Sequence, residues 1–298
     1  MISKNVYIFA KKLEMRIASN RIRDIKTFAQ KELKDIYSEN EIRSMITLLI
    51  EHFTGLDSIK QSIEPQTTVL ESDLLKLNFA IKDLKKEKPL QYIIGKTIFY
   101  DLEILLNQKV LIPRPETEEL VDLIIKENKD RNDLVIADLG CGSGAIALAL
   151  KNNIPQSKIY AFDIEDEAIE QTKDNSKRLN LEIDIQKKDI LNPSFTNIEF
   201  DIIVSNPPYV MENEKPLMKN NVLNYEPHTA LFVENNEALI FYKSIAEFAK
   251  TNLKPKGKIY LEINENLAKE TSELFSQLNP EIKKDLFGRD RFIIASKQ

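Results

Sequence analysis

The hydrophobic positions of the chain change their spacing near residue 89. Before that point apolar residues recur every three or four positions, which predicts amphipathic helices. One helix is expected after Ser38, because Ser38 and Glu41 have capping-box spacing and an apolar stripe follows at Ile42, Met45, Ile46, Leu49, Ile50 and Phe53. Another is expected from about Asp73 to Lys86. Residues 1–88 are therefore predicted to form a small helical bundle.

Residues 89–112 show a different pattern. The stretch YIIGKTIFYDLEILLN alternates in part and is rich in Ile, Phe and Tyr, which predicts a linking β-hairpin. Residues 113–298 form the second predicted domain, where apolar strands alternate with helical segments from about residue 131. This alternation predicts a parallel sheet with helices on both faces, so the expected fold class is α/β. Ligands of such sheets bind at the carboxyl ends of the strands.

Composition narrows the class of protein. The 298 residues are 42% hydrophobic and 30% charged, with a formal net charge of −5, which is typical of a soluble globular chain. The acidic balance argues against stable nucleic-acid binding, because phosphate contacts require a basic face. A single cysteine, Cys141, excludes an internal disulfide, and with two histidines no metal site is expected. The N-terminal apolar stretch is too short and broken for a secretory signal, so a cytoplasmic protein without a membrane segment is predicted.

Glycine is scarce but clustered. Three of the seven glycines, Gly140, Gly142 and Gly144, lie in DLGCGSGAIAL, where the first strand of the α/β half turns into a helix. Glycines at such a turn permit positive φ and let a ligand approach the backbone closely. A triphosphate-binding loop would need lysine after the last glycine, and this chain has Ala145 there. The turn therefore predicts a nucleoside-type ligand without a triphosphate.

Two acidic residues near the turn reduce the number of possible ligands further. Asp163 ends the next strand, at the distance where an acidic residue binds ribose hydroxyls. Asp138, just before the turn, would suit a cationic ligand better than a pyrophosphate. These residues favour S-adenosylmethionine, but a nicotinamide dinucleotide stays open on this evidence alone.

The strand DIIVS ends in Asn206, Pro207, Pro208 and Tyr209. Neither proline can donate to a β-ladder, so strand pairing ends there. A planar amide or exocyclic amine is a weak nucleophile, because its lone pair is delocalised, and it must be held in line with the methyl group that it attacks. The Asn206 oxygen and a prolyl carbonyl can accept both N–H hydrogens and support the developing charge, and Tyr209 offers a flat face. The tetrapeptide is therefore predicted to clamp a planar nitrogen group.

The glycine turn, Asp163 and SNPPY together resemble Rossmann-like class I methyltransferases that act on planar nitrogens. PLQYIIGKTIFYDLEI, VLIPRPETEELVDLI, NYEPHTALF and FGRDRF narrow the resemblance to the release-factor glutamine methyltransferases (HemK/PrmC type), from about Pro89 to the C-terminus. The helical first domain also fits that family. Its members use S-adenosylmethionine to methylate the side-chain amide nitrogen of the glutamine in the Gly-Gly-Gln motif of class 1 peptide-chain release factors.

The resemblance implies roles for particular residues. Asn206, Pro207 and Tyr209 would be catalytic, and the substrate amide would be held by Asn206, Pro207, Pro208 and Tyr209. The cofactor would be bound by Gly140, Cys141, Gly142, Ser143, Gly144, Asp163 and Asn206, with Asp189 and Ile190 flanking its adenine. Residues 1–88 would dock the release factor. The chain departs from the family at Asn264 and Leu267, where Gly and Gln are frequent, and at Ile190, where some members have an aromatic residue.

Two other functions stay open. A nucleic-acid methyltransferase that acts on adenine or guanine could use the same clamp, but it would need a basic recognition region and a flipped base. A non-catalytic ribosome-associated binding protein could keep the fold, although it would not need an amine clamp. Around the site, Tyr225 and Glu226 are expected at the substrate entrance, His228 as a structural loop residue, and Cys141 as a small packed side chain.

Overall fold

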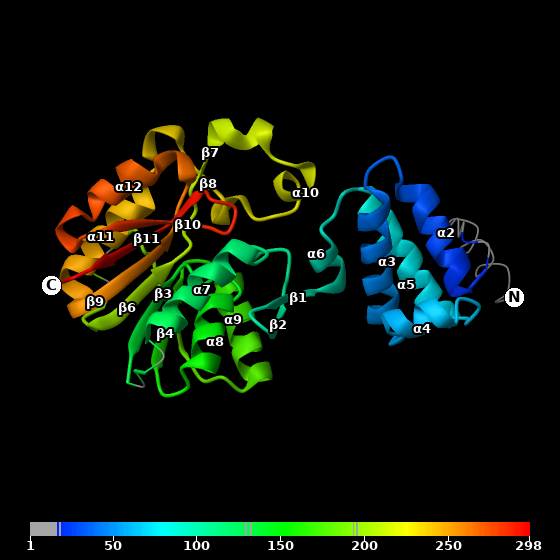
Figure 1. The fold of residues 1–298 in the computed structure, drawn as a ribbon, viewed down its shortest axis with the longest axis horizontal. Coiled ribbons are helices and arrows are strands. Elements are labelled where there is room, and N and C mark those ends of the chain that lie inside the picture. Colours follow the sequence, from blue (N-terminus) through cyan, green and yellow to red (C-terminus); the bar gives the residue numbers. More distant parts are fainter. Residues whose placement is uncertain (1–16, 18, 129, 132, 193, 195) are drawn as a thin grey trace, which may run out of the picture. The chain divides into compact units, whose positions relative to one another are not determined.

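The structure of the chain is a computed structural model that describes residue 17 and residues 19–128, 130–131, 133–192, 194 and 196–298. The start of the chain, for which the sequence predicts no secretory signal, lies outside these residues. The chain divides into two compact units, Met1–Ile94 and Gly95–Gln298 (Figure 1). Each unit has a hydrophobic core of its own.

The first unit is a bundle of helices. The predicted capping box begins one of them: the Glu41 amide donates to Ser38 Oγ, and the Ser38 amide donates to Glu41 Oε2. Gly55, at φ 72°, ends the same helix in the left-handed region. Both helices predicted here are confirmed. The described helices are α2 (Ile22–Leu33), α3 (Glu39–Thr54), α4 (Ser58–Ile63), α5 (Glu71–Lys85) and α6 (Leu90–Ile94).

The linking hairpin is confirmed, but it begins later than predicted. The amides of Tyr92 and Ile93 donate to the Pro89 carbonyl, so the proline begins the short helix α6 where an extended segment was expected. The strands β1 (Lys96–Phe99) and β2 (Leu102–Leu105) then pair antiparallel.

The described part of the second unit contains a seven-stranded sheet in the order β10-β11-β9-β6-β3-β4-β5. The parallel strands are β3 (Val135–Leu139), β4 (Lys158–Asp163), β5 (Asp184–Lys187), β6 (Phe200–Ser205) and β9 (Leu253–Glu262). β11 (Asp290–Ser296) joins β9 antiparallel, and β10 (Glu281–Lys284) joins β11 antiparallel. The predicted parallel sheet is therefore correct except at this edge, where a short connection allows only an antiparallel neighbour.

Helices cover both faces of this sheet, as predicted. One layer consists of α7 (Pro115–Asn128), α8 (Ala145–Asn153) and α9 (Asp166–Leu179), and the other of α11 (Ile240–Asn252) and α12 (Ala268–Leu274) (Figure 1). Phe162, Phe200 and Phe248 are fully buried in the core that the sheet shares with α11 and α12. After β6 the chain forms the shorter elements β7 (Val210–Met211), α10 (Asn220–Leu223) and β8 (Phe232–Val233).

The strand order creates a crevice at one edge of the sheet. β3 lies between β4 and β6, so the chain leaves β3 in one direction and later returns on its other side. Such a switch point opens a ligand site at the carboxyl ends of the strands. The glycine turn follows β3 and Asn206 follows β6, so the two sequence motifs meet at this edge. Among the described residues, no helix is long and apolar enough to cross a membrane.

Candidate active site

A cavity of about 430 Å³ lies at the carboxyl edge of the sheet. Its walls come from seven segments of the chain: the loop before α7, the glycine turn, the ends of β4, β5 and β6 with the residues that follow them, the stretch around β8, and the start of α11. The lining residues are Lys109, Val110, Leu111, Gly140, Gly142, Asp163, Ile164, Glu165, Ala168, Lys188, Asp189, Ile190, Leu191, Asn206, Pro208, Thr229, Ala230, Phe232 and Phe241.

The three glycines of the turn have two structural roles: two of them leave space at the cavity, and the third allows close packing against a helix. All three have positive φ, at 77° for Gly140, 56° for Gly142 and 80° for Gly144. A Cβ on Gly140 or Gly142 would meet no atom within 4 Å, and both residues line the cavity, so they leave room beside the backbone. A Cβ on Gly144 would lie 2.7 Å from Thr172 Cγ2, so this glycine allows the turn to pack closely on α9.

Cys141 and Ser143 lie in the same turn but do not line the cavity. Both are buried, and Cys141 Sγ lies 3.6 Å from Thr172 Oγ1. Burial raises the pKa of the Cys141 thiol well above its usual value, which disfavours the thiolate that a nucleophile needs. The Ser143 carbonyl accepts from Asn175 Nδ2 at 3.0 Å, and Asn175 Oδ1 accepts from the Leu105 amide at 2.8 Å. These contacts fix the shape of the turn and tie it to β2.

Asp163 and Asp138 lie in different environments. Asp163 lines the cavity, where Oδ2 accepts from the Gly142 amide at 2.8 Å and Oδ1 accepts from the Glu165 amide at 3.0 Å. Burial raises the pKa of Asp163, although these bonds oppose the shift. Asp138 is completely buried beneath the turn, where Oδ2 accepts from the Ala147 amide at 3.2 Å and burial raises its pKa to about 7. Asp138 therefore does not meet a ligand directly, contrary to the expectation from its position.

The segment after β5 supplies an apolar part of the wall. Asp189 Oδ1 accepts from the Leu191 amide at 2.9 Å, which turns the chain, and the apolar side chain of Ile190 is buried beside it. The Ile190 carbonyl accepts from Ser244 Oγ at 2.5 Å, so α11 holds this segment in place. Phe241 also belongs to the lining, so this part of the wall is largely apolar, which is typical of small-molecule sites.

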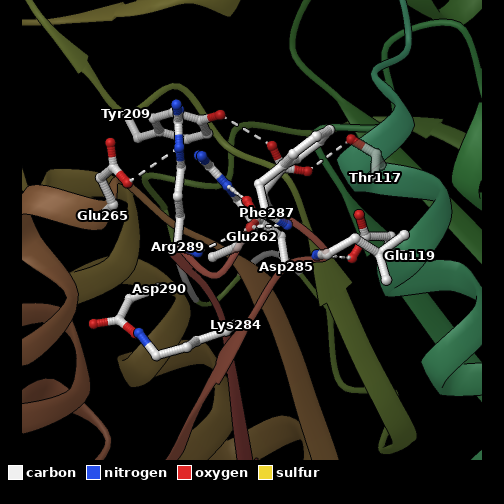
Figure 2. Close-up of polar contacts among 12 residues, drawn as sticks. Thr117, Glu119, Tyr209, Glu262, Glu265, Lys284, Asp285, Phe287, Arg289 and Asp290 are labelled. Atoms are coloured by element: carbon white, nitrogen blue, oxygen red, sulfur yellow. Dashed lines mark hydrogen bonds and ion pairs between the residues drawn. The ribbon is translucent and has the colours of Figure 1, made fainter.

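Asn206 is held by a chain of hydrogen bonds behind the cavity wall. Its Nδ2 donates to Thr117 Oγ1 at 3.1 Å, and Thr117 Oγ1 donates to Glu262 Oε2 at 2.7 Å. Tyr209 donates its hydroxyl to Glu262 Oε1 at 2.9 Å, so both oxygens of one carboxylate are used (Figure 2). No described residue donates to Asn206 Oδ1, so this oxygen is open to a further hydrogen-bond donor.

The other motif residues surround this position. Pro208 lines the cavity with Asn206, whereas Pro207 is buried and Tyr209 packs against the core beneath the sheet edge. Asn264, which occupies a position where the family often has glycine, donates from Nδ2 to the Tyr209 carbonyl at 3.1 Å. The departure from the family pattern therefore adds a contact that supports the motif.

Thr117 and Glu262 are the parts of the site that the sequence reasoning missed. Glu262 ends β9 with 1% of its surface exposed. Burial raises the pKa of Glu262, while the hydrogen bonds from Thr117 and Tyr209 and the charge of Arg291 oppose the shift. The available signal was an acidic residue at the carboxyl end of the apolar strand KIYLEI, because ligands bind at that edge.

The loop after α10 lies close to the cavity. Glu226 is buried, where Oε1 accepts from Arg114 Nη2 at 2.6 Å and Oε2 accepts from the Ile112 amide at 3.3 Å. His228 Nε2 donates to the Leu223 carbonyl at 2.9 Å, which fits a structural role in this loop. A second cavity, of about 560 Å³, is lined in part by Tyr225 and Glu226 and shares three lining residues with the first: Lys109, Glu165 and Thr229.

Comparison with protein families agrees with this geometry. The family model described as the methyltransferase small domain matches residues 117–225, which include the glycine turn, Asp163 and the SNPPY segment. A second model, the PrmC N-terminal domain, matches residues 24–95 of the helical unit. The fold and the site together define a Rossmann-like methyltransferase with an N-terminal helical domain.

Individual relatives make the assignment specific. A release factor glutamine methyltransferase of Flavobacterium psychrophilum is 42% identical and covers 91% of this chain and 98% of its own. A release factor glutamine methyltransferase of Bacteroides thetaiotaomicron is 37% identical, and the match covers 92% of this chain and 99% of that relative. A solved release factor-specific protein-(glutamine-N5) methyltransferase of Alicyclobacillus acidocaldarius is 25% identical over 63% of this chain and 94% of that one, with a TM-score of 0.40. The chain belongs to the release factor glutamine methyltransferase family.

Proposed function

We propose that the chain uses S-adenosylmethionine to methylate the side-chain amide nitrogen of the glutamine in the Gly-Gly-Gln motif of class 1 release factors. The observation that carries this proposal is Asn206, which lies on the cavity wall with its Nδ2 bonded to Thr117 and its Oδ1 left to accept. The family assignment supports the same reaction. Because release factors act on ribosomes, the proposed place of action is the cytoplasm.

The residues of the cavity fit S-adenosylmethionine. Gly140 and Gly142 leave open space where other residues would have a Cβ, so the turn can receive a ligand against its backbone. We assign the ribose hydroxyls to Asp163, whose oxygens each keep a lone pair beyond their backbone bonds. The adenine is assigned to Asp189 and Ile190, and the rest of the cofactor to Asn206 and the turn, which Cys141, Ser143 and Gly144 shape. When bound, the cofactor supplies a methyl group on a positively charged sulfonium.

Asn206 and Pro207 are proposed to hold the substrate amide. The glutamine side chain has two N–H hydrogens, and the Asn206 Oδ1 and the Pro207 carbonyl would each accept one. Two acceptors fix the plane of the amide and direct the nitrogen toward the methyl group. The nitrogen gains positive charge as the bond forms, so these acceptors bind the transition state more strongly than the ground state. Pro208 and Tyr209 would border the amide plane, and the released proton can pass to water.

Recognition of the release factor is proposed to involve two further parts of the chain. All residues that line the cavity belong to the second unit, and residues 1–88 are assigned to docking the protein substrate. The match of residues 24–95 to a domain of this family supports that role. The second cavity, beside Tyr225 and Glu226, would receive the chain next to the glutamine, because it adjoins the first cavity.

The test is the destination of a labelled methyl group. The purified chain would be incubated with labelled S-adenosylmethionine and, in parallel, with a full-length class 1 release factor, the same factor with its Gly-Gly-Gln glutamine replaced by alanine, or cellular nucleic acid. We expect label in the unaltered release factor alone. Label in adenine or guanine would support a nucleic-acid methyltransferase instead. Cofactor binding without transfer to any acceptor would favour the non-catalytic alternative.

A further inference from the structure

The hydrogen bonds behind Asn206 have a fixed direction. Glu262 has one oxygen toward Thr117 and the other toward Tyr209, and an ionised carboxylate can only accept. A threonine hydroxyl carries one hydrogen, and that of Thr117 is donated to Glu262 at 2.7 Å. Thr117 Oγ1 can therefore act toward Asn206 only as an acceptor. An amide that faces such an acceptor must present its NH2 group, which turns its oxygen the other way.

The surroundings of Glu262 keep this arrangement rigid. Glu262 and Thr117 are 1% and 3% exposed, so water does not compete for their hydrogen bonds. Burial raises the pKa of Glu262, while both hydroxyl donors and the positive charge of Arg291 oppose that shift. Each carboxylate oxygen faces a hydroxyl group, which is the hydrogen-bond pattern of an ionised carboxylate that accepts at both oxygens. The three bonded side chains come from α7, the end of β9 and the loop after β6, so separate parts of the fold meet at one carboxylate (Figure 2).

We infer that Glu262 and Thr117 are positioning residues that select the orientation of the Asn206 amide, so that its oxygen and not its nitrogen faces the substrate. This inference rests on the proposed function of Asn206 as an acceptor for the glutamine N–H. In the reversed orientation Asn206 would present a donor to a group that also donates, and the clamp would repel its substrate. A carboxylate that touches neither substrate nor cofactor thus decides whether the site works.

The test compares two substitutions at Thr117. Thr117→Val keeps the shape of the side chain and removes the hydroxyl, whereas Thr117→Ser keeps the hydroxyl. Thr271→Val is the matched control, because Thr271 is also fully buried in the second unit and its hydroxyl has no partner among the described residues. Glu262→Gln is a fourth variant, in which a side-chain NH2 must face one of the two hydroxyls. A thermal melt first verifies that each full-length variant folds. We then measure kcat and KM with a full-length release factor, and S-adenosylmethionine affinity by calorimetry.

We expect Thr117→Val to lower kcat by up to about 100-fold, the loss that a small displacement of a positioned group can cause, with KM and cofactor affinity little changed. Thr117→Ser should restore most of the turnover, and Thr271→Val should resemble the unaltered chain. Glu262→Gln should lower kcat less than Thr117→Val does, because its NH2 can face Tyr209 and leave an acceptor for Thr117. Normal turnover in Thr117→Val, or equal losses in Thr117→Val and Thr117→Ser, would overturn the inference while the proposed function stands. If Glu262→Gln does not fold, the comparison of Thr117→Val with Thr117→Ser still tests the positioning role. Failure of the unaltered chain to label the release factor would overturn the proposed function, and this inference with it.

Discussion

Substitution of Asn206 tests the proposed clamp most directly. Asn206→Ala removes the Oδ1 acceptor while Gly140, Gly142 and Asp163 keep their places in the cavity wall. Loss of one preorganised hydrogen-bonding group at a reacting centre costs about 2.7–4 kcal/mol, or roughly 10²–10³ in rate. We therefore expect turnover to fall by about that factor, with S-adenosylmethionine affinity little changed.

Asn206→Asp separates the acceptor role of the side chain from its donor role. A carboxylate is the stronger acceptor, so if acceptance alone mattered this variant would be more active than Asn206→Ala. The structure predicts otherwise, because the new oxygen would replace Nδ2 at 3.1 Å from Thr117 Oγ1, whose hydrogen is committed to Glu262. Turning that hydrogen away would leave a buried oxygen of Glu262 unpaired, at a cost of about 1–3 kcal/mol, and would bring a second negative charge near the first.

The expected result is that Asn206→Asp is no more active than Asn206→Ala. Single-turnover transfer of labelled methyl to a full-length release factor, with enzyme in excess, measures the step in question without interference from product release. Calorimetry with S-adenosylmethionine identifies losses that arise only from cofactor binding. Near-normal turnover of Asn206→Ala would refute the clamp. A clearly more active Asn206→Asp would refute the need for a donor toward Thr117.

Three further predictions concern the cofactor, the first unit and pH. Asp163→Ala should weaken S-adenosylmethionine binding by about 1.5–3 kcal/mol in calorimetry, and unchanged affinity would exclude it as a ligand. Residues 95–298 alone should bind the cofactor normally but show a raised KM for the release factor, and an unchanged KM would contradict the docking role. Burial raises the pKa of Asp138 to about 7, so the folded chain keeps a proton that the unfolded chain has already released, and its stability falls as pH rises from the ordinary aspartate pKa to about 7. An asparagine at position 138 does not titrate. In denaturant titrations the unfolding free energy of Asp138→Asn, relative to that of the unaltered chain, should therefore be higher at pH 8 than at pH 5. The same difference in unfolding free energy at pH 5 and at pH 8 would contradict the buried-proton explanation.

Most of the fold could be predicted because its elements carry strong local signals. The helix after Ser38 combines a capping box with a long apolar stripe. In the second unit β3 ends just before Gly140, and β4 and β9 end at the acidic residues Asp163 and Glu262. The failures occurred where local patterns are ambiguous. The short apolar run at residues 90–94 fits helix and strand equally, and its hydrogen bonds to Pro89 decided the outcome. Strand direction at the β10–β11 edge depends on the connection and not on periodicity.

The site was predictable in location more than in detail. The glycine turn and Asn206 were expected together because parallel strands end at the same edge of a sheet. Whether a side chain near the end of a strand faces the ligand or the core is not encoded by residue type, so Asp138 was expected to meet the ligand and is buried in β3 instead. The bond between Thr117 and Glu262 joins positions 145 residues apart and depends on how α7 packs beside β9. Such a contact can be found only in the folded chain.

The two hydrophobic cores have a thermodynamic consequence. The core of the first unit draws on residues before Gly95 and the core beneath the sheet on residues after it, with no member in common. Two-state unfolding is a property of single cooperative domains, so one melting temperature need not describe this chain. S-adenosylmethionine would stabilise the unit that contains the cavity, by about 2.7 kcal/mol at one hundred times its Kd, whereas the described residues of the helical bundle contribute nothing to the cavity lining. A destabilising substitution in that bundle could therefore reduce the amount of active protein in a cell even when the cofactor is abundant.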